Sequence, residues 1–311
     1  MRVIVMGTGG VGGYFGGRLA QGGCDVRFVA RGEHLAALRE HGLRIESKLG
    51  DLQLAVRASD DAASLGPADF ILISVKLWDT ETALQAIAPL VGPETAVVSF
   101  QNGVEKEEIL RRHLPQRAVL GGVSYVSAKI LRPGVISQSG AMQKLVFGEF
   151  DGSASDRTAA LLDACKRGGI DAEISPDITR AIWEKFIFLV GLSAVTTAMR
   201  STIGPIRGNG RTRSFLLDVM REVVAVGRAQ GVHLEEDLAE KQLAFCDGLP
   251  PGMTSSMHTD LEAGRRLELN WLSGGVTELG RLAGVSTPLN RAVCDILALH
   301  TQGRNANSQA G

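Results

Sequence analysis

The chain has 311 residues, of which 44% are hydrophobic and 22% charged, and its formal net charge is −1 at pH 7. This is the composition of a globular protein long enough for two domains, and it carries neither the basic excess of a nucleic-acid-binding protein nor a polybasic tract for a membrane surface. The opening segment is too short in apolar residues for a signal peptide. Four scattered cysteines show no metal-binding spacing, so we expect free thiols, no metal site and a reducing cytoplasm (Cys24, Cys165, Cys246 and Cys294).

The first thirty-one residues predict a strand, a glycine turn, a helix and a second strand. Residues 2–6 (RVIVM) form an apolar run that leads directly into GTGGVG at 7–12, and a helical pattern continues to Ala20. Residues 25–30 (DVRFVA) are typical of a strand. A GxGxxG motif that follows a strand and opens a helix is the fingerprint of a dinucleotide-binding βαβ unit, although a glycine turn in an ordinary βαβ unit is the alternative.

Each glycine of this fingerprint has its own expected part. Gly7 permits the tight turn, Gly9 lets the backbone approach a pyrophosphate, and Gly12 lets helix and strand pack closely. The helix start offers free N–H groups to the phosphates. We therefore assign the whole loop to cofactor binding, namely Gly7, Thr8, Gly9, Gly10, Val11 and Gly12.

The end of the second strand indicates which dinucleotide is bound. NAD-specific folds usually carry Asp or Glu there to bind the ribose 2′-hydroxyl, whereas this chain has Ala30-Arg31-Gly32. An arginine suits a 2′-phosphate through its charge and its forked donors. Arg31 therefore favours NADP(H) over NAD(H); the alternative is an exposed arginine before a helix.

The rest of the first half alternates strands and helices. We expect strands at 43–45, 52–56, 69–75 and 96–100 and helices at 33–40, 79–89 and 104–113. This alternation predicts an α/β fold with a Rossmann-type, doubly wound sheet. Shorter β-like runs over 118–148 predict an antiparallel extension of that sheet.

The second half is predicted to be all helical. We place an NADP-binding domain at residues 1–175, a helical substrate and catalytic domain at 176–301, and a disordered tail at 302–311. The uncharged stretch 186–199 is too short to span a bilayer, so we expect a buried helix. Its apolar helices are compatible with a homodimer and equally with a domain core.

Four polar residues stand out beyond the glycine loop. Lys76 and Asn102 each follow an apolar strand, so both belong at the carboxyl edge of the sheet, where ligands bind in doubly wound folds. Lys185 opens the most apolar stretch of the chain, and Glu268 follows Arg265-Arg266-Leu267. A lysine that snorkels at a helix end and a glutamate on a solvated helix face are the alternatives for the last two.

Taken together, these motifs resemble the ketopantoate reductase (2-dehydropantoate 2-reductase) family. The similarity runs along nearly the whole chain, in order: GTGGVGGYFGGRLA at 7–20, VK at 75–76, QNGVE at 101–105, WEKF at 183–186, SSM at 255–257 and RRLE at 265–268.

The resemblance implies roles for individual residues. Lys185 corresponds to the general acid that polarises the substrate ketone and protonates its oxygen as hydride reaches C2. Glu268 corresponds to a glutamate that binds a substrate hydroxyl and helps to position the lysine. Lys76 and Asn102 match positions beside the nicotinamide and the substrate, and Ser256 matches a serine that holds the substrate carboxylate. The implied cofactor is NADPH, and no metal is needed.

The chain departs from the family where the substrate contacts lie. The family carries asparagines four and eight residues after its lysine, on the same helix face. Here those substrate-binding positions are Leu189 and Ser193. We expect a less polar pocket for a branched or bulkier 2-oxo acid, because an apolar lining discriminates weakly. The alternative is that Asn270, Thr196 and Ser193 bind ketopantoate itself.

Three functions remain open from the sequence. The first is NADPH-dependent reduction of a 2-oxo acid, ketopantoate or a close analogue. The second is a related two-domain dehydrogenase acting on another hydroxy acid or an imine, which would not be expected to keep Lys185, Asn102 and Glu268 together. The third is a catalytically silent NADP(H)-binding sensor. In each, the partner is a small molecule and not a nucleic acid or a membrane.

Overall fold

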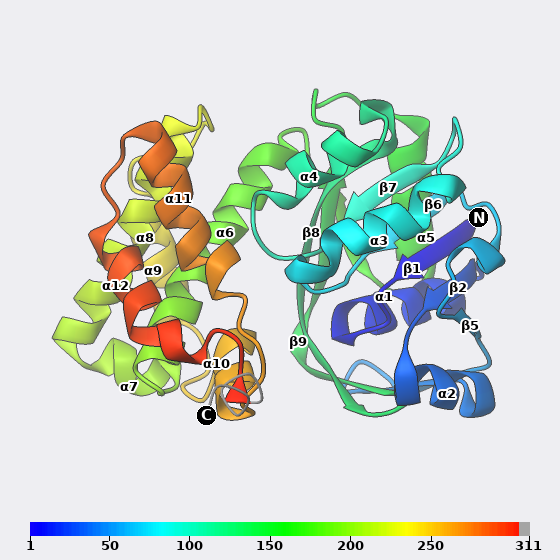
Figure 1. The fold of residues 1–311 in the computed structure, drawn as a ribbon, viewed down its shortest axis with the longest axis horizontal. Coiled ribbons are helices and arrows are strands. Elements are labelled where there is room, and N and C mark those ends of the chain that lie inside the picture. Colours follow the sequence, from blue (N-terminus) through cyan, green and yellow to red (C-terminus); the bar gives the residue numbers. More distant parts are fainter. Residues whose placement is uncertain (305–311) are drawn as a thin grey trace, which may run out of the picture. The chain divides into compact units, whose positions relative to one another are not determined.

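The computed structural model describes residues 1–304, and its chain divides into two units (Figure 1). The first unit holds Met1–Asn102 and Lys106–Ala181. The second holds the short segment Gly103–Glu105 and the residues from Ile182 onward. This division falls inside one helix, α6 (Ile178–Ala198).

The first unit contains a six-stranded parallel sheet with the strand order β5-β2-β1-β6-β7-β8. This order is that of the dinucleotide-binding Rossmann fold, which confirms the predicted fold class. The sequence did not predict β5, because three residues of mixed polarity give no strand signal. The strands are β1 (Arg2–Met6), β2 (Asp25–Val29), β5 (Arg57–Ser59), β6 (Phe70–Ile73), β7 (Ala96–Ser99) and β8 (Val119–Arg132).

Helices cover both faces of this sheet, so its central strands are apolar throughout. On β1, Val3 and Val5 pack with the helices α1, α2 and α5, whereas Ile4 and Met6 pack with α3 and α4. These helices are α1 (Gly10–Gln21), α2 (Gly32–His41), α3 (Thr80–Ile87), α4 (Lys106–His113) and α5 (Asp156–Arg167). The helices predicted at 33–40, 79–89 and 104–113 all form, and their ends differ from the prediction by at most two residues.

An antiparallel hairpin extends the sheet, as predicted for 118–148. Its two strands are β8 and β9 (Val135–Gly148), and β3 (Leu43–Ser47) continues from β9, followed by β4 (Leu52–Leu54). A further strand, β10 (Asp171–Ile174), pairs with β9 in parallel. Its four residues alternate between exposed and partly buried, which is too short a pattern to mark a strand in the sequence.

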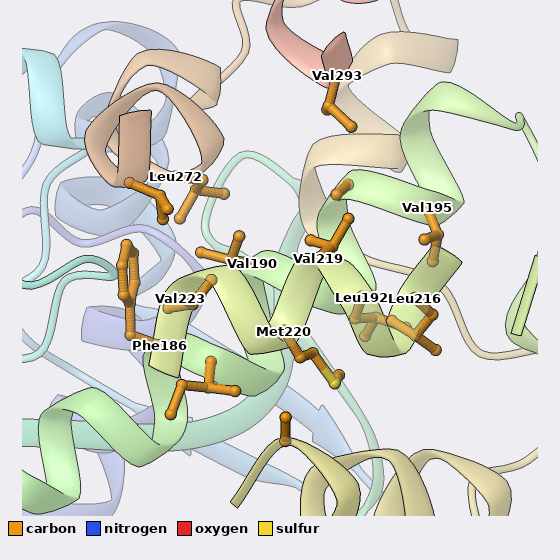
Figure 2. Close-up of a cluster of buried hydrophobic side chains, with 14 of the residues drawn as sticks. Phe186, Val190, Leu192, Val195, Leu216, Val219, Met220, Val223, Leu272 and Val293 are labelled. Atoms are coloured by element: carbon orange, nitrogen blue, oxygen red, sulfur yellow. The ribbon is translucent and has the colours of Figure 1, made fainter. Parts of the chain in front are cut away.

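The second unit is helical, in agreement with the prediction. It consists of most of α6 together with α7 (Ile203–Gly208), α8 (Gly210–Ala229), α9 (Leu238–Asp247), α10 (Ser256–Glu262), α11 (Ser273–Ala283) and α12 (Pro288–Leu297). Figure 2 shows its core, where Phe186 and Val190 of α6 meet Val219 and Val223 of α8 and Leu272 from the loop before α11.

The apolar stretch of α6 is a core helix, although it is longer than the fourteen residues predicted. With 21 residues it is long and apolar enough to cross a membrane, but 67% of its most apolar stretch is buried inside the protein. Within the predicted tail, Gly303 N donates to His300 O and Arg304 N donates to Gly264 O, both at 3.0 Å. The remainder of the predicted tail, residues 305–311, lies outside the described residues.

Candidate active site

The carboxyl ends of three neighbouring strands bring the predicted cofactor residues together in the first unit. Met6 of β1, Ile73 of β6 and Ser99 of β7 lie opposite one another in register. The ladder ends with hydrogen bonds of 2.9 Å from Ser74 N to Met6 O and from Phe100 N to Ile73 O. The segments that follow are the glycine loop, the loop of Lys76 and the loop of Asn102. They therefore leave the sheet side by side at one edge.

Three glycines of the fingerprint differ in what a side chain would meet. Gly7 has a φ of +100°, and a Cβ atom there would lie 2.7 Å from Val75 N, so both the turn and the close approach require glycine. A Cβ at Gly12 would lie against the Gly7 carbonyl and 2.8 Å from Val5 Cγ1, because helix and strand pack closely at this point. A Cβ at Gly9 would meet nothing within 4 Å, so open space adjoins this backbone.

The loop is held against the neighbouring strand, and the helix it opens has a bare start. Thr8 donates to Val29 O from its amide at 3.0 Å and from its hydroxyl at 2.9 Å. No side chain caps the first turn of α1, and its N-cap residue is Gly9. The uncapped N–H groups, the helix dipole and the open space at Gly9 together fit a pyrophosphate. Nearby, a Cβ at Gly10 would collide with the Ala128 carbonyl of β8.

The residues after β2 lie at the start of α2. Arg31 is exposed and is the N-cap residue of that helix, without a capping side-chain hydrogen bond. His34, one turn later, accepts a hydrogen bond at Nδ1 from Gly134 N at 3.0 Å. Because Nδ1 accepts, the neutral ring carries its proton on Nε2. Burial lowers the pKa of His34, and the nearby Thr8 backbone opposes this shift only in part.

The Lys76 and Asn102 loops have further neighbours that the sequence did not single out. Lys76 is partly buried, with its Nζ 5.6 Å from the ring centroid of Trp78. Asn102 is also partly buried. Between the two loops lies the side chain of Gln101, only 5% exposed, which donates to Val75 O at 3.0 Å. Its position directly after an apolar strand was the signal that could have revealed it.

A buried ion pair at the start of α4, which follows the Asn102 loop, was also not predicted. Lys106, the first residue of α4, bonds to Glu107 and donates to Gly122 O at 2.7 Å and Ser99 O at 3.3 Å. Burial raises the pKa of Glu107, and the adjacent Lys106 ammonium works against that rise. Removing one partner would leave an unpaired buried charge, which is strongly destabilising.

In the second unit, α6 carries the residues predicted to bind the substrate. Lys185 and Leu189 are both partly buried and lie one turn apart on the same helix face. Ser193, one turn further, is completely buried, and its hydroxyl has no hydrogen-bond partner among the described residues. In this structure Ser193 therefore offers no surface to a substrate, and its predicted part in binding stays untested. Thr196 is also fully buried.

Ser256 and Glu268 lie on separate segments of the second unit. Ser256 is exposed at the start of α10, whose cap residue Ser255 accepts from His258 N at 3.1 Å. The Ser255 hydroxyl also lies 3.0 Å from the hydroxyl of Thr196, which ties this helix start to α6. Glu268 is 5% exposed, and its neighbours in sequence, Leu267 and Leu269, belong to the core of the second unit. Glu268 is thus buried, and the alternative of a solvated face is wrong.

Comparison with known proteins identifies the family. The description "Ketopantoate reductase PanE/ApbA" matches residues 3–152, and its C-terminal counterpart matches residues 177–301. The chain belongs to the ketopantoate reductase family. It is 31% identical to a 2-dehydropantoate 2-reductase of Mesorhizobium japonicum, over 94% of this chain and 95% of that protein. It is 30% identical to the uncharacterized oxidoreductase YkpB of Bacillus subtilis, over 94% of this chain and 96% of that protein.

A solved structure agrees with this assignment. The PanE/ApbA family ketopantoate reductase of Ralstonia eutropha shares 32% identity and a TM-score of 0.88, covering 97% of this chain and 98% of that one. Membership of the ketopantoate reductase family indicates an oxidoreductase that acts on a CH–OH group with a nicotinamide cofactor. Within residues 1–304 no group of three or more His, Cys, Asp or Glu side chains could hold a metal ion.

Proposed function

We propose that the protein reduces a 2-oxo acid, ketopantoate or a close analogue, to the 2-hydroxy acid with NADPH. The observation that carries the proposal is the in-register ending of β1, β6 and β7, which places the glycine loop, Lys76 and Asn102 at one sheet edge. A bare helix start at this edge suits the cofactor pyrophosphate. Lys76 and Asn102 are then the residues available to contact the nicotinamide and the substrate.

The preference for NADPH rests on the charges at the end of β2. Arg31 is exposed there and can pair with a 2′-phosphate. The acidic residue that follows Arg31 in sequence is Glu33, in the first turn of α2, and the two carboxylates on the loop after β5 have partners of their own. Asp60 pairs with Arg39 at 3.4 Å, and Asp61 accepts from Ala63 N at 3.0 Å. The position directly after β2 is therefore an arginine, where NAD-specific folds supply a carboxylate to the ribose 2′-hydroxyl.

In the proposed reaction, Lys185 acts as the general acid. The bound reduced nicotinamide supplies the hydride that C2 of the 2-oxo acid receives. As that C–H bond forms, the carbonyl electron pair moves to oxygen, and Lys185 donates a proton from its ammonium to give the hydroxyl. A cation beside a charge that develops only in the transition state lowers the barrier. Glu268 is proposed to bind a substrate hydroxyl and to orient this lysine.

The identity of the 2-oxo acid depends on the α6 face that carries Lys185. Leu189 lies one turn from it, partly buried, and contributes an apolar surface where the family has asparagine. We therefore propose a pocket that tolerates an apolar side chain on the 2-oxo acid. The test is kcat/KM for ketopantoate against an analogue without its distal hydroxyl. A ratio near one supports this lining, whereas a preference of a hundredfold or more for ketopantoate contradicts it.

The function itself is tested by NADPH oxidation with a small panel of 2-oxo acids. We expect turnover with at least one of them and recovery of the 2-hydroxy acid in equal amount. Replacement of NADPH by NADH measures the cofactor preference in the same assay. NADPH binding without turnover on any member would favour the silent sensor, and turnover only on an imine assayed beside the panel would favour the related dehydrogenase.

A further inference from the structure

The two loops that carry Lys76 and Asn102 need something to hold them together beyond the ends of their strands. The last ladder bond between β6 and β7 runs from Phe100 N to Ile73 O. The β6–β7 ladder stops at this point, and a site residue follows each strand. One side chain that spans the two segments is Gln101, the residue immediately before Asn102.

Both ends of the Gln101 amide are fixed. Its Nε2 donates to Val75 O at 3.0 Å and to the Thr80 hydroxyl at 2.8 Å. Its Oε1 accepts from the Ser99 hydroxyl at 3.1 Å. Because the Val75 carbonyl can only accept, the NH₂ group must face it, and the orientation of the amide is determined.

The protons of the surrounding hydroxyls agree with this orientation. Thr80 donates its single proton to Leu77 O at 2.7 Å, so its oxygen is left to accept from Gln101. Ser99 gives its proton to the Gln101 side chain and accepts from the Gln101 amide N–H at 3.3 Å. Every donor therefore has an acceptor, in a buried network where an unmatched group would be costly.

The carbonyls of the same segment are held as well. Lys106 donates to Ser99 O, and the Ser124 hydroxyl donates to Phe100 O at 3.1 Å. The side chain of Gln101 therefore projects from a backbone segment whose preceding carbonyls are held by hydrogen bonds. Through Val75 on one side and Thr80 on the other, its side chain brackets the turn that begins at Lys76.

We propose that Gln101 is a positioning residue that sets the Lys76 loop relative to Asn102 without touching substrate or cofactor itself. The inference rests on the proposed function, in which these two loops line the reacting centre. Displacement of a reacting group by about 1 Å can cost on the order of a hundredfold in rate. The absence of a direct contact predicts a loss in kcat with little change in NADPH affinity.

The test begins with Gln101→Met, which keeps the side-chain length but removes the amide. We expect kcat for the best 2-oxo acid to fall ten- to a hundredfold and the NADPH Kd to change by less than about threefold. The same substitution added to Lys76→Ala should have little further effect, because residues that act through one another are not additive. A full, independent loss in the Lys76→Ala background would overturn the proposal.

The matched control is Thr95→Val. Thr95 directly precedes β7, whereas Gln101 lies beyond the other end of that strand. Thr95 is 5% exposed, and its hydroxyl donates to Ala68 O at 2.9 Å, so the change also removes a buried hydrogen bond. We expect it to lower the melting temperature without lowering kcat. A comparable fall in kcat in this control would mean that Gln101 acts only through general stability.

Gln101→Glu supplies a second readout should the methionine variant fold poorly. A carboxylate cannot donate to Val75 O, whereas the protonated acid can. The kcat of Gln101→Glu should therefore be well below that of wild type at pH 8. The deficit should shrink as pH falls, because burial at this position raises the pKa of a carboxyl and favours its protonated form. A kcat for Gln101→Glu equal to that of wild type at pH 8, where the carboxylate cannot donate, contradicts the inference. If wild type itself reduces no 2-oxo acid, the proposed function fails, and that result is distinct from an active wild type with unaffected variants.

Discussion

The two units place their candidate site residues by different means. In the first unit, backbone register decides where Lys76 and Asn102 leave the sheet, because both follow parallel strands that end opposite each other. In the second unit, Lys185, Ser256 and Glu268 lie on three separate segments that side-chain packing holds in one helical core. A strand can shift its register only in whole residues, whereas the positions of packed helices depend on the sizes and shapes of the side chains between them. The placement of Lys76 and Asn102 therefore depends on backbone hydrogen bonds, whereas that of Lys185, Ser256 and Glu268 depends on side-chain contacts.

The largest effect is expected for Lys185→Ala in the second unit. Loss of a general acid typically costs about 10²- to 10⁴-fold, so kcat/KM for the 2-oxo acid should fall by that range. The NADPH Kd should stay within about twofold if the two units divide their tasks as proposed. Steady-state kinetics and fluorescence titration measure the two quantities. Lys166→Ala, an exposed lysine of α5, is the control, and an equal kinetic loss there would refute the acid role.

The next effect tests the cofactor half through Arg31→Ala. A hydrogen bond to a charged group contributes about 1.5–3 kcal/mol, so the NADPH Kd should rise roughly ten- to a hundredfold. Binding of NADH should hardly change, because it has no 2′-phosphate. Lys166→Ala, an exposed lysine of α5, again serves as the control. Equal weakening of NADPH and NADH would show that Arg31 does not read the 2′-phosphate.

The sequence predicted the site residues of the first unit better than those of the second, because the positions of residues after parallel strands follow from backbone register. Apolar runs with a polar residue at the carboxyl end were enough to place Lys76 and Asn102, since parallel strands share one edge. The complete burial of Ser193 was not predictable, because helical spacing gives a face but not what covers it. The sequence did not single out Gln101, because its proposed positioning role depends on hydrogen bonds to Val75 and Thr80, which are distant in sequence.

A pair of glycine substitutions separates folding from cofactor binding within the fingerprint. Gly12→Ala should lower the free energy of unfolding by about 1–3 kcal/mol, because the new methyl collides with the Gly7 carbonyl and Val5. Gly9→Ala should leave stability within about 0.5 kcal/mol, since its Cβ enters open space. Only the latter should weaken NADPH in a protein of normal stability. Urea denaturation and cofactor titration of both variants distinguish these outcomes, and a destabilised Gly9→Ala would contradict the open space.

The smallest effect concerns His34, which packs beside the glycine loop and the β8–β9 turn. Burial lowers its folded-state pKa below the ordinary value of 6.5, so the folded protein disfavours the proton that the unfolded chain accepts. Stability should thus be unaffected by His34 well above pH 6.5 and should decline as pH falls below that value, by no more than about 1.4 kcal/mol per pH unit.

His34→Gln can still accept from Gly134 but does not titrate. Urea unfolding at pH 7.5 and 5.5 should show a smaller decline in this variant than in wild type. His41→Gln, an exposed histidine of the same helix, should behave as wild type, and an identical decline in all three proteins would assign the pH dependence to other groups.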